Sequence, residues 1–225
     1  MGIEAELIRF GKFTRFATRD LDTNWRSIDY CAIDVETTGL NLKDDEIISI
    51  GAAQIHMGRI TVENNFYREA RPCRLPSIPS VQIHGLRVID LESIAPIESV
   101  IPDFVAQING RVLIAHAAWV EYAFLKRHLR GTGLRFSKQM IDTAALARAL
   151  GYGESVSGHE PSLESLALRI HLPVYAPHNA LGDALTTAVV FLALATELER
   201  EYLAKGASVL SLRTLLEVSA KNSRH

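Results

Sequence analysis

The stretch I-D-Y-C-A-I-D-V-E at residues 28–36, followed at once by T-T-G at 37–39, decides how this chain folds. Its apolar run predicts a buried strand that ends at the turn. Side chains alternate along a strand, so Asp34 and Glu36 share one face while Val35 points to the other. Two carboxylates held that close repel each other unless a cation lies between them. A bare pair of this kind is most simply a surface pair on an edge strand, but α/β sheets place ligands at the carboxyl ends of their strands, which makes the pair a candidate site for a divalent cation.

The rest of the chain predicts an α/β fold. Two further β-like runs follow the first, with Asn41 and Gly58 as turn residues, so the simplest assembly is a three-stranded meander. Hydrophobic periodicity and capping residues then predict helices that alternate with short strands. The expected helices cover 97–109, 117–130, 142–150, a short stretch from Ser162, and 179–203, and the expected strands cover 111–115 and 136–141. A meander followed by this alternation indicates a sheet of mixed direction that is flanked by helices.

The length predicts one domain. With 225 residues, of which 48% are hydrophobic, the chain can build a single large core. We expect this domain at 27–205, preceded by an N-terminal arm or helix at 1–26 and followed by a C-terminal amphipathic segment at 206–225. The apolar run at 184–196 is shorter than the roughly 20 residues of a membrane span, so it predicts a buried core helix and no membrane contact.

Charge and cysteine content narrow the class of protein. The formal net charge of −2 provides no global positive field, which argues against a protein that coats nucleic acid passively. An enzyme that holds a phosphodiester through bound metal ions stays open, because the ions bring the positive charge. Cys31 and Cys73 lack C-x-x-C spacing, so we expect neither a disulfide framework nor a zinc site, and a reducing, cytoplasmic location.

A second group of polar residues lies in P-H-N-A-L-G-D-A, residues 177–184. If His178 and Asp183 were both helical, their five-residue spacing would set them about 140° apart around the axis. The sensible geometry therefore has His178 on a loop, Asn179 as the N-cap, and Asp183 in the first turn of the helix. An acid there also complements the helix dipole, so helix-end electrostatics and a functional role are equally good interpretations of this pattern taken alone.

The third group is H-A-A-W-V-E, residues 116–121, at the start of an expected helix. Glu121 shares a side of that helix with Leu125 and His128. It is either one surface charge or a carboxylate on a core-facing edge, and burying an unpaired carboxylate is costly. In the second case Glu121 needs a partner, and a metal site would supply one.

Four stretches together resemble, in order and spacing, the DnaQ-like (DEDDh) 3′–5′ exonucleases, the group of the proofreading epsilon subunit of bacterial DNA polymerase III and of RNase T. These stretches are I-D-V-E-T-T-G-L at 33–40, the segment ending V-E-Y-A-F-L at 120–125, D-T-A-A-L-A-R at 142–148 and H-N-A-L-G-D-A at 178–184. The resemblance covers roughly residues 28–200 and implies an RNase H-like fold. It also implies stepwise removal of nucleotides from the 3′ end of single-stranded DNA or RNA, with two divalent cations, Mg²⁺ or Mn²⁺, as cofactors.

Carried over by position, the resemblance implies four metal ligands: Asp34, Glu36, Glu121 and Asp183. It implies His178 as the general base, because an imidazole can take a proton near neutral pH. The residues expected to meet the terminal nucleotide are Thr37, Thr38, Leu40 and His84, and for His84 a purely structural role is as good an interpretation.

The chain departs from the family pattern at two positions. Glu121 stands where the family has Asp, and Ala117 stands where it has Asn. These departures leave open a catalytically weakened module that binds nucleic acid or a polymerase. A third interpretation is a structural subunit whose terminal segments dock a larger assembly. A DNA polymerase and a second copy of the chain are further partners that the resemblance leaves open.

Three nearby features are expected to be structural. We expect His116 to end its strand and Asp142 to cap the helix that follows it. The acidic run at 44–46 is expected to be a solvated turn.

Overall fold

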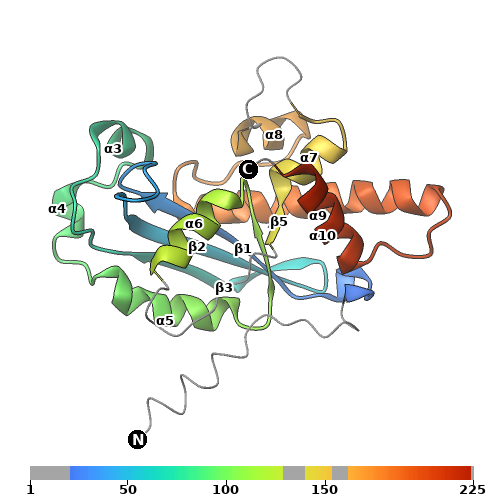
Figure 1. The fold of residues 1–225 in the computed structure, drawn as a ribbon, viewed down its shortest axis with the longest axis horizontal. Coiled ribbons are helices and arrows are strands. Elements are labelled where there is room, and N and C mark those ends of the chain that lie inside the picture. Colours follow the sequence, from blue (N-terminus) through green and yellow to red (C-terminus); the bar gives the residue numbers. More distant parts are fainter. Residues whose placement is uncertain (1–20, 129–139, 154–161, 224–225) are drawn as a thin grey trace, which may run out of the picture.

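The computed structural model describes residues 21–128, 140–153 and 162–223. Within these ranges, strands form one mixed sheet in the order β3-β2-β1-β4-β5 (Figure 1). The first three are antiparallel neighbours, as the expected meander requires, and β4 and β5 add in parallel beside β1. The strands are β1 (Tyr30–Thr37), β2 (Ile47–His56), β3 (Arg59–Glu69), β4 (Val112–Ala115) and β5 (Met140–Asp142).

Helices cover both faces of this sheet, and α3 and α4 lie beyond the strand ends (Figure 1). A short 3-10 helix, η1 (Trp25–Ser27), precedes β1. The helices are α3 (Ile78–His84), α4 (Val88–Leu91), α5 (Ile97–Ile108), α6 (Trp119–His128), α7 (Thr143–Ala149), α8 (Leu163–Arg169), α9 (Ala180–Ala204) and α10 (Leu212–Asn222). The prediction of a mixed α/β sheet flanked by helices is confirmed.

The two-residue period of β1 divides the core into two parts. Tyr30 and Ala32 pack in the cluster built around α9, whereas Cys31 and Ile33 pack in the cluster built around α5. Asp34 and Glu36 continue the even-numbered series and therefore face the α9 side. The strand pattern thus sets which helix the two acids meet.

Helix α9 is the central helix of its face. It is long and apolar enough to cross a membrane by length and composition, but it packs against β1 and β2, and 56% of its most apolar window is buried in the domain. The expected core helix is therefore observed. It begins after its predicted N-cap, Asn179, whose side chain accepts hydrogen bonds from the N–H groups of Leu181 and Gly182.

Several element boundaries differ from the predicted ones. Residues 129–130 of the predicted helix and 136–139 of the predicted strand lie outside the described residues. Asp142 is the last residue of β5 and, as expected, the N-cap of α7, so this helix begins at Thr143, one residue after the start of the predicted 142–150 range. Within the C-terminal amphipathic segment expected at 206–225, the helix starts only at Leu212, because Ser211 caps it and also pairs with Asn24.

The segment that precedes β1 packs against the domain. Residues 1–20 of the expected N-terminal arm lie outside the described part of the chain. Trp25 has no exposed surface, its ring packs edge-on against Phe191 at 5.8 Å, and its N–H donates to the carbonyl of Leu210 at 3.1 Å. Residues just before and just after the predicted 27–205 domain therefore meet each other as part of its core.

Candidate metal centre and active site

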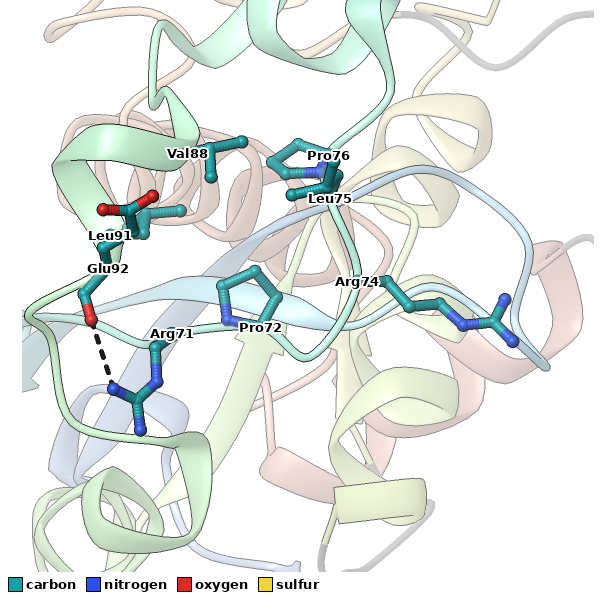
Figure 2. Close-up of a pocket in the computed structure, with 8 residues that line it drawn as sticks. All are labelled: Arg71, Pro72, Arg74, Leu75, Pro76, Val88, Leu91 and Glu92. Carbon is teal, nitrogen blue, oxygen red and sulfur yellow. Dashed lines mark hydrogen bonds between the residues drawn. The ribbon is translucent and has the colours of Figure 1, made fainter.

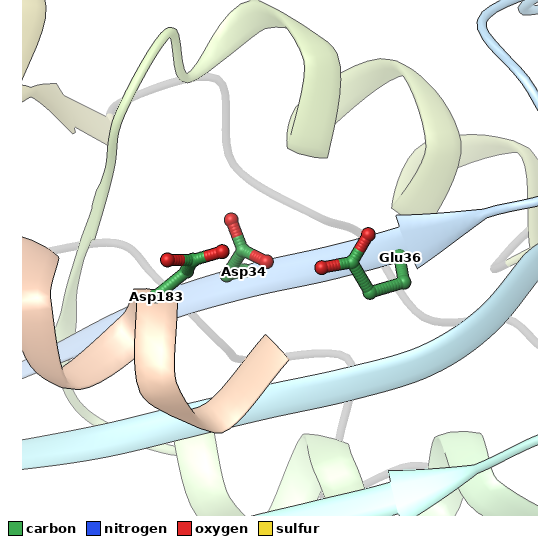
Figure 3. Close-up of side chains that lie close together, drawn as sticks. All are labelled: Asp34, Glu36 and Asp183. Atoms are coloured by element: carbon green, nitrogen blue, oxygen red, sulfur yellow. The ribbon is translucent and has the colours of Figure 1, made fainter. Parts of the chain in front are cut away.

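Three carboxylates from two distant parts of the chain converge at the end of β1. Asp34 and Glu36 project from β1, and Asp183 reaches them from the first turn of α9 (Figure 3). One oxygen from each lies within 4.8 Å of the others. The structure therefore brings together three of the four predicted metal ligands.

The start of α9 sets the place of Asp183. The Asp183 N–H donates to the Asn179 carbonyl at 2.8 Å, and the Asp183 Oδ2 accepts from the His178 N–H at 2.9 Å. His178 has a left-handed backbone, with φ of 60°, which turns the chain into the helix. His178 is exposed on the loop beside Asp183, in the position predicted for it.

A glycine lets α9 approach the sheet. Gly51 on β2 is the register partner of Asp34, and a Cβ atom there would lie 2.0 Å from the Ala180 carbonyl oxygen. No side chain fits in that space, so the first residues of α9 rest directly on β2. The sequence interpretation missed this role, although a glycine inside an apolar strand pattern signals close backbone approach.

The electrostatics of the cluster favour a cation. Burial raises the pKa of Asp34 well above its usual range, and the charges of Glu121, Glu36 and Asp183 raise it further. Burial, with the Asp183 charge, raises the pKa of Glu36 to about 7, and burial raises that of Asp183 to about 6. Burial disfavours the charge of all three carboxylates, neighbouring acids add repulsion at Asp34 and Glu36, and a divalent cation among them would offset both effects.

Glu121 lies close to this cluster but outside the group of three. Strand β4 pairs with β1 only as far as Ala32, so the end of β1 is open on that side and α6 lies there. The Glu121 side chain is buried, with 5% exposed, and its charge is the largest of those that raise the pKa of Asp34. Its Oε2 atom has no hydrogen-bond partner among the described residues, which is costly for a carboxylate that lacks a cation.

Asp142 joins two turns beside Glu121. Its Oδ1 accepts hydrogen bonds from the Ala144 N–H at 2.9 Å and from the Ala117 N–H at 3.0 Å. The first contact is the predicted helix cap. The second was not predicted, because residue 117 is near only in the folded chain; it holds the left-handed turn, with φ of 56°, that precedes α6.

Thr37 and Thr38 use most of their polar groups inside the fold. The Thr37 hydroxyl donates to the Gly39 carbonyl at 2.7 Å, and the Thr38 hydroxyl donates to Asp45 at 2.8 Å. The Thr38 N–H donates to the Glu46 carbonyl at 2.9 Å, so this backbone donor is already engaged. Leu40, in contrast, is 83% exposed and can meet a base by apolar contact.

His84 has a partner for each ring nitrogen. Its Nε2 lies 3.1 Å from the Ser80 hydroxyl, and its Nδ1 accepts from the Leu86 N–H at 3.0 Å. Burial lowers the pKa of His84, and the nearby His178 lowers it further. These contacts are those of a structural histidine that ends α3 close to the His178 loop.

The acidic run at 44–46 follows a turn at 42–44, with Asp44 exposed as expected and with Asp45 and Glu46 partly buried in an ordered loop. Glu46 accepts from the N–H groups of Cys73 and Arg74 at 2.6 Å and 3.1 Å. Arg127 of α6 donates to the carbonyls of Leu42 and Asp45. The loop therefore ties α6 to the segment that leads into α3.

A cavity of about 250 Å³ lies beside this loop and holds none of the predicted site residues (Figure 2). Its walls come from the segment after β3 and from α4. They are formed by Arg71, Pro72, Arg74, Leu75, Pro76, Val88, Leu91 and Glu92. The Arg71 guanidinium donates to the Glu92 carbonyl at 3.1 Å and closes one side.

Known proteins match most of the chain. The family described as Exonuclease matches residues 31–191. A DNA polymerase III PolC-type protein of Thermotoga petrophila is 31% identical over 205 residues, which are 91% of this chain. A DNA polymerase III subunit epsilon-like protein of Rhodobacter capsulatus is 31% identical over 191 residues, which are 84% of it. The chain spans only 14% and 27% of the length of these two relatives.

Solved structures share the fold. The nuclease domain of 3′hExo, a DEDDh family member bound to rAMP, superposes with a TM-score of 0.62 at 15% identity. The match covers 84% of this chain and 98% of that domain. The mixed sheet with its flanking helices is therefore the fold of a known nuclease domain.

Proposed function

This chain belongs to the exonuclease family, and on that premise we propose that it removes nucleotides one at a time from the 3′ end of single-stranded DNA or RNA with the help of two divalent cations. The observation that carries the proposal is the cluster of Asp34, Glu36 and Asp183 at the open end of β1. Hydrolysis of a phosphodiester needs positive charge beside the phosphate. The three side chains of this cluster are carboxylates, so bound cations would have to supply that charge.

The donor set fits hard cations. Carboxylate oxygens are the ligands that Mg²⁺ and Mn²⁺ prefer, and the pKa values of Glu36 and Asp183 are raised mainly by burial, which disfavours their charged forms unless a cation is bound. Asp34, Glu36 and Asp183 would hold one cation, and Glu121, with its unpartnered Oε2, would support a second beside Asp34. When bound, two such cations activate a water and stabilise the leaving 3′ oxygen.

His178 is proposed as the general base. It is exposed next to Asp183, to which its N–H is bonded, so its ring can reach the side of the cluster from which water arrives. Leu40, exposed just beyond the threonines that follow Glu36, is proposed to pack against the terminal base. Thr37 and Thr38 are proposed to support this contact, because their hydroxyls hold the turn that leads to Leu40. His84 is proposed to support it from the end of α3, where its ring accepts from the Leu86 N–H.

The relatives suggest where the activity is used. Two of them are a DNA polymerase III protein and an epsilon-like subunit, so we infer that this chain works with a DNA polymerase in the cytoplasm. Its own pairing into a homodimer stays a prediction from the sequence.

The direct test is a 5′-labelled oligonucleotide ladder on DNA and on RNA, with Mg²⁺, Mn²⁺ or EDTA. The wild type should shorten the 3′ end stepwise only when metal is present, and Asp34→Ala should not. Asp103→Asn, a change of an exposed acid on α5, is the matched control and should keep full activity. Binding of the oligonucleotide without shortening would instead fit the weakened module and would overturn the proposal.

The role of His178 has its own test. His178→Ala should lower kcat by about 10²–10⁴-fold, the usual contribution of a general base, with little change in the binding of substrate. If turnover and its pH dependence stay as in the wild type, another group takes the proton.

A further inference from the structure

The C-terminal helix lies outside the matched family region but contacts Asp142, the residue that holds the turn before α6. The family match ends at residue 191, and α10 begins at Leu212. Helix α10 packs on α7 and β5, and its Leu212 and Leu215 side chains have no exposed surface. It therefore covers the side of β5 that no strand pairs within the described residues.

The segment before β1 anchors the start of α10. The Leu212 N–H donates to the Thr23 carbonyl at 3.1 Å, and the Arg213 guanidinium bonds Asp22 at 2.7 Å. Together with the bridge between Asn24 and Ser211, these contacts hold the first turn of the helix. These contacts fix the first turn of α10 on the domain, at the opposite end of the helix from Ser219.

Ser219, near the other end of α10, contacts the active-site scaffold. The Asp142 N–H donates to the Ser219 hydroxyl oxygen at 2.9 Å, and both residues are almost fully buried. Because the Asp142 N–H is buried, removal of the Ser219 hydroxyl would take a hydrogen-bond acceptor away from a buried backbone donor.

The contact continues through Asp142 to the start of α6. Asp142 holds the Ala117 N–H, and next to it the Thr143 hydroxyl lies 2.9 Å from the His116 ring and donates to the Ala115 carbonyl at 3.3 Å. The β5–α7 turn therefore holds the β4–α6 turn at several points. A shift of Asp142 would move the residue from which α6 starts.

The position of Glu121 depends on where α6 begins. The Ala117 carbonyl accepts from the Val120 N–H at 3.0 Å, so the left-handed turn and the first turn of α6 form one unit. The Glu121 Oε2 has no hydrogen-bond partner among the described residues that would hold it in place independently. The carboxylate is consequently positioned by the backbone of α6.

We propose that Ser219 is a positioning residue of the active site, which holds Glu121 in place for a divalent cation through Asp142 and Ala117. This inference rests on the proposed function, because it assigns a scaffold to the same metal centre. It makes the C-terminal helix a working part of the exonuclease domain rather than a segment that docks a larger assembly.

The test is Ser219→Ala in the full chain, with two readouts. Direct Mn²⁺ titration by calorimetry, without substrate, should give a dissociation constant about tenfold higher, as when an outer-shell partner of a metal site is lost. In the nuclease assay kcat at limiting Mn²⁺ should fall by a similar factor, while KM for the oligonucleotide stays unchanged and excess Mn²⁺ restores turnover.

Two controls separate positioning from general loss of stability. Ser223→Ala removes a hydroxyl that bonds the Ser219 carbonyl in the same helix, and should keep wild-type Mn²⁺ affinity. Val105→Ala, in the core on α5, should lower the unfolding midpoint at least as much but leave Mn²⁺ affinity unchanged.

The possible outcomes are distinct. Equal weakening of Mn²⁺ binding by Val105→Ala and Ser219→Ala, or wild-type affinity in Ser219→Ala, would overturn the inference. A wild-type chain that neither binds Mn²⁺ nor shortens the oligonucleotide would refute the proposed function instead.

Discussion

Glu121 is one of the two positions at which the family resemblance leads us to expect a different residue, and its surroundings are compatible with a carboxylate that supports a cation. The side chain is buried beside Asp34, and its free oxygen faces no hydrogen-bond donor among the described residues. Glu reaches one methylene further than Asp, and Glu121 stands just outside the three carboxylates that lie within 4.8 Å of one another. A longer side chain at this distance can still support a cation.

We predict that Glu121→Asp preserves or raises kcat, because the shorter acid keeps the charge and the family geometry. Glu121→Gln, which keeps the length but removes the charge, should raise the Mn²⁺ concentration needed for half-maximal activity at least about tenfold. Both are measured with the 5′-labelled oligonucleotide over a Mn²⁺ series. A large drop in Glu121→Asp would show that the site is built around the longer side chain.

Ala117 is strained where the family has Asn. Its φ of 56° costs a residue with a Cβ atom about 1 kcal/mol or more, a penalty that Asn tolerates and glycine avoids. We predict that Ala117→Gly leaves the free energy of unfolding unchanged or raises it by up to about 1 kcal/mol, since the strain relieved exceeds the entropy that glycine adds to the unfolded chain.

The control for Ala117→Gly is Ala123→Gly, inside α6, which should cost about 1 kcal/mol because its backbone is helical. Urea unfolding of the three proteins measures the difference. Equal losses at both positions would mean that the turn at residue 117 is not strained.

At the scale of elements, the docking of α9 on β2 sets the distance between Asp183 and Asp34. The register pairs Asp34 with Gly51, and the backbone of Ala180 fills the space where a side chain would stand. Only direct contact between the helix start and the strand brings the third carboxylate into reach.

We predict that Gly51→Ala costs about 1–3 kcal/mol of stability by overpacking and lowers kcat by roughly 10²-fold, because it displaces Asp183 from the cluster. Circular dichroism melts and the ladder assay measure the two effects. Gly153→Ala is the matched control, since its Cβ would lie 3.1 Å from the Arg148 Cγ atom and no nearer than 3.7 Å to the backbone of Arg148. Full activity in Gly51→Ala would show that α9 has room to move.

At the scale of the whole molecule, the acidic cluster links stability to pH and to metal. The pKa of Glu36 rises from 4.5 to about 7 on folding, and that of Asp183 from 3.8 to about 6. A group whose pKa is higher in the folded state binds protons more tightly there, so its stabilising contribution is complete below about pH 4 and is lost as the pH rises to about 7. A metal cation competes with these protons and is favoured as they leave.

We predict that saturating Mg²⁺ raises the melting temperature little at about pH 5 and clearly at about pH 8, with most of the change between pH 5 and 7, the range set by these two groups. Without metal, Asp34→Asn should melt at a higher temperature than the wild type near pH 7, because it removes one charge from the cluster. Melts with Mg²⁺ and with EDTA across this range measure both effects. A metal-induced shift of the same size at both ends of the range would contradict the assignment.

The termini contribute to the same unit. The segment at 22–25 pairs with 210–213, and α10 carries Ser219 to Asp142. Residues on both sides of the matched family region, 31–191, therefore contact each other within one domain.

The sequence by itself determined the features that depend on near neighbours. The period of two placed Asp34 and Glu36 on one face, and the N-caps Asn179, Asp142 and Ser162 begin their helices as predicted, because strand alternation and capping act over a few residues. The order of strand and helix patterns added the mixed sheet, and the family resemblance added the pairing of these acids with Asp183.

Only the tertiary structure decided which contacts form between segments that are distant in the sequence. It brought Asp183 to Asp34 through Gly51, engaged the Thr38 N–H with Glu46, and linked Ser219 to Asp142. No local pattern specifies these contacts, since each depends on the sheet register and on how closely a helix packs against a strand that lies far away in the chain.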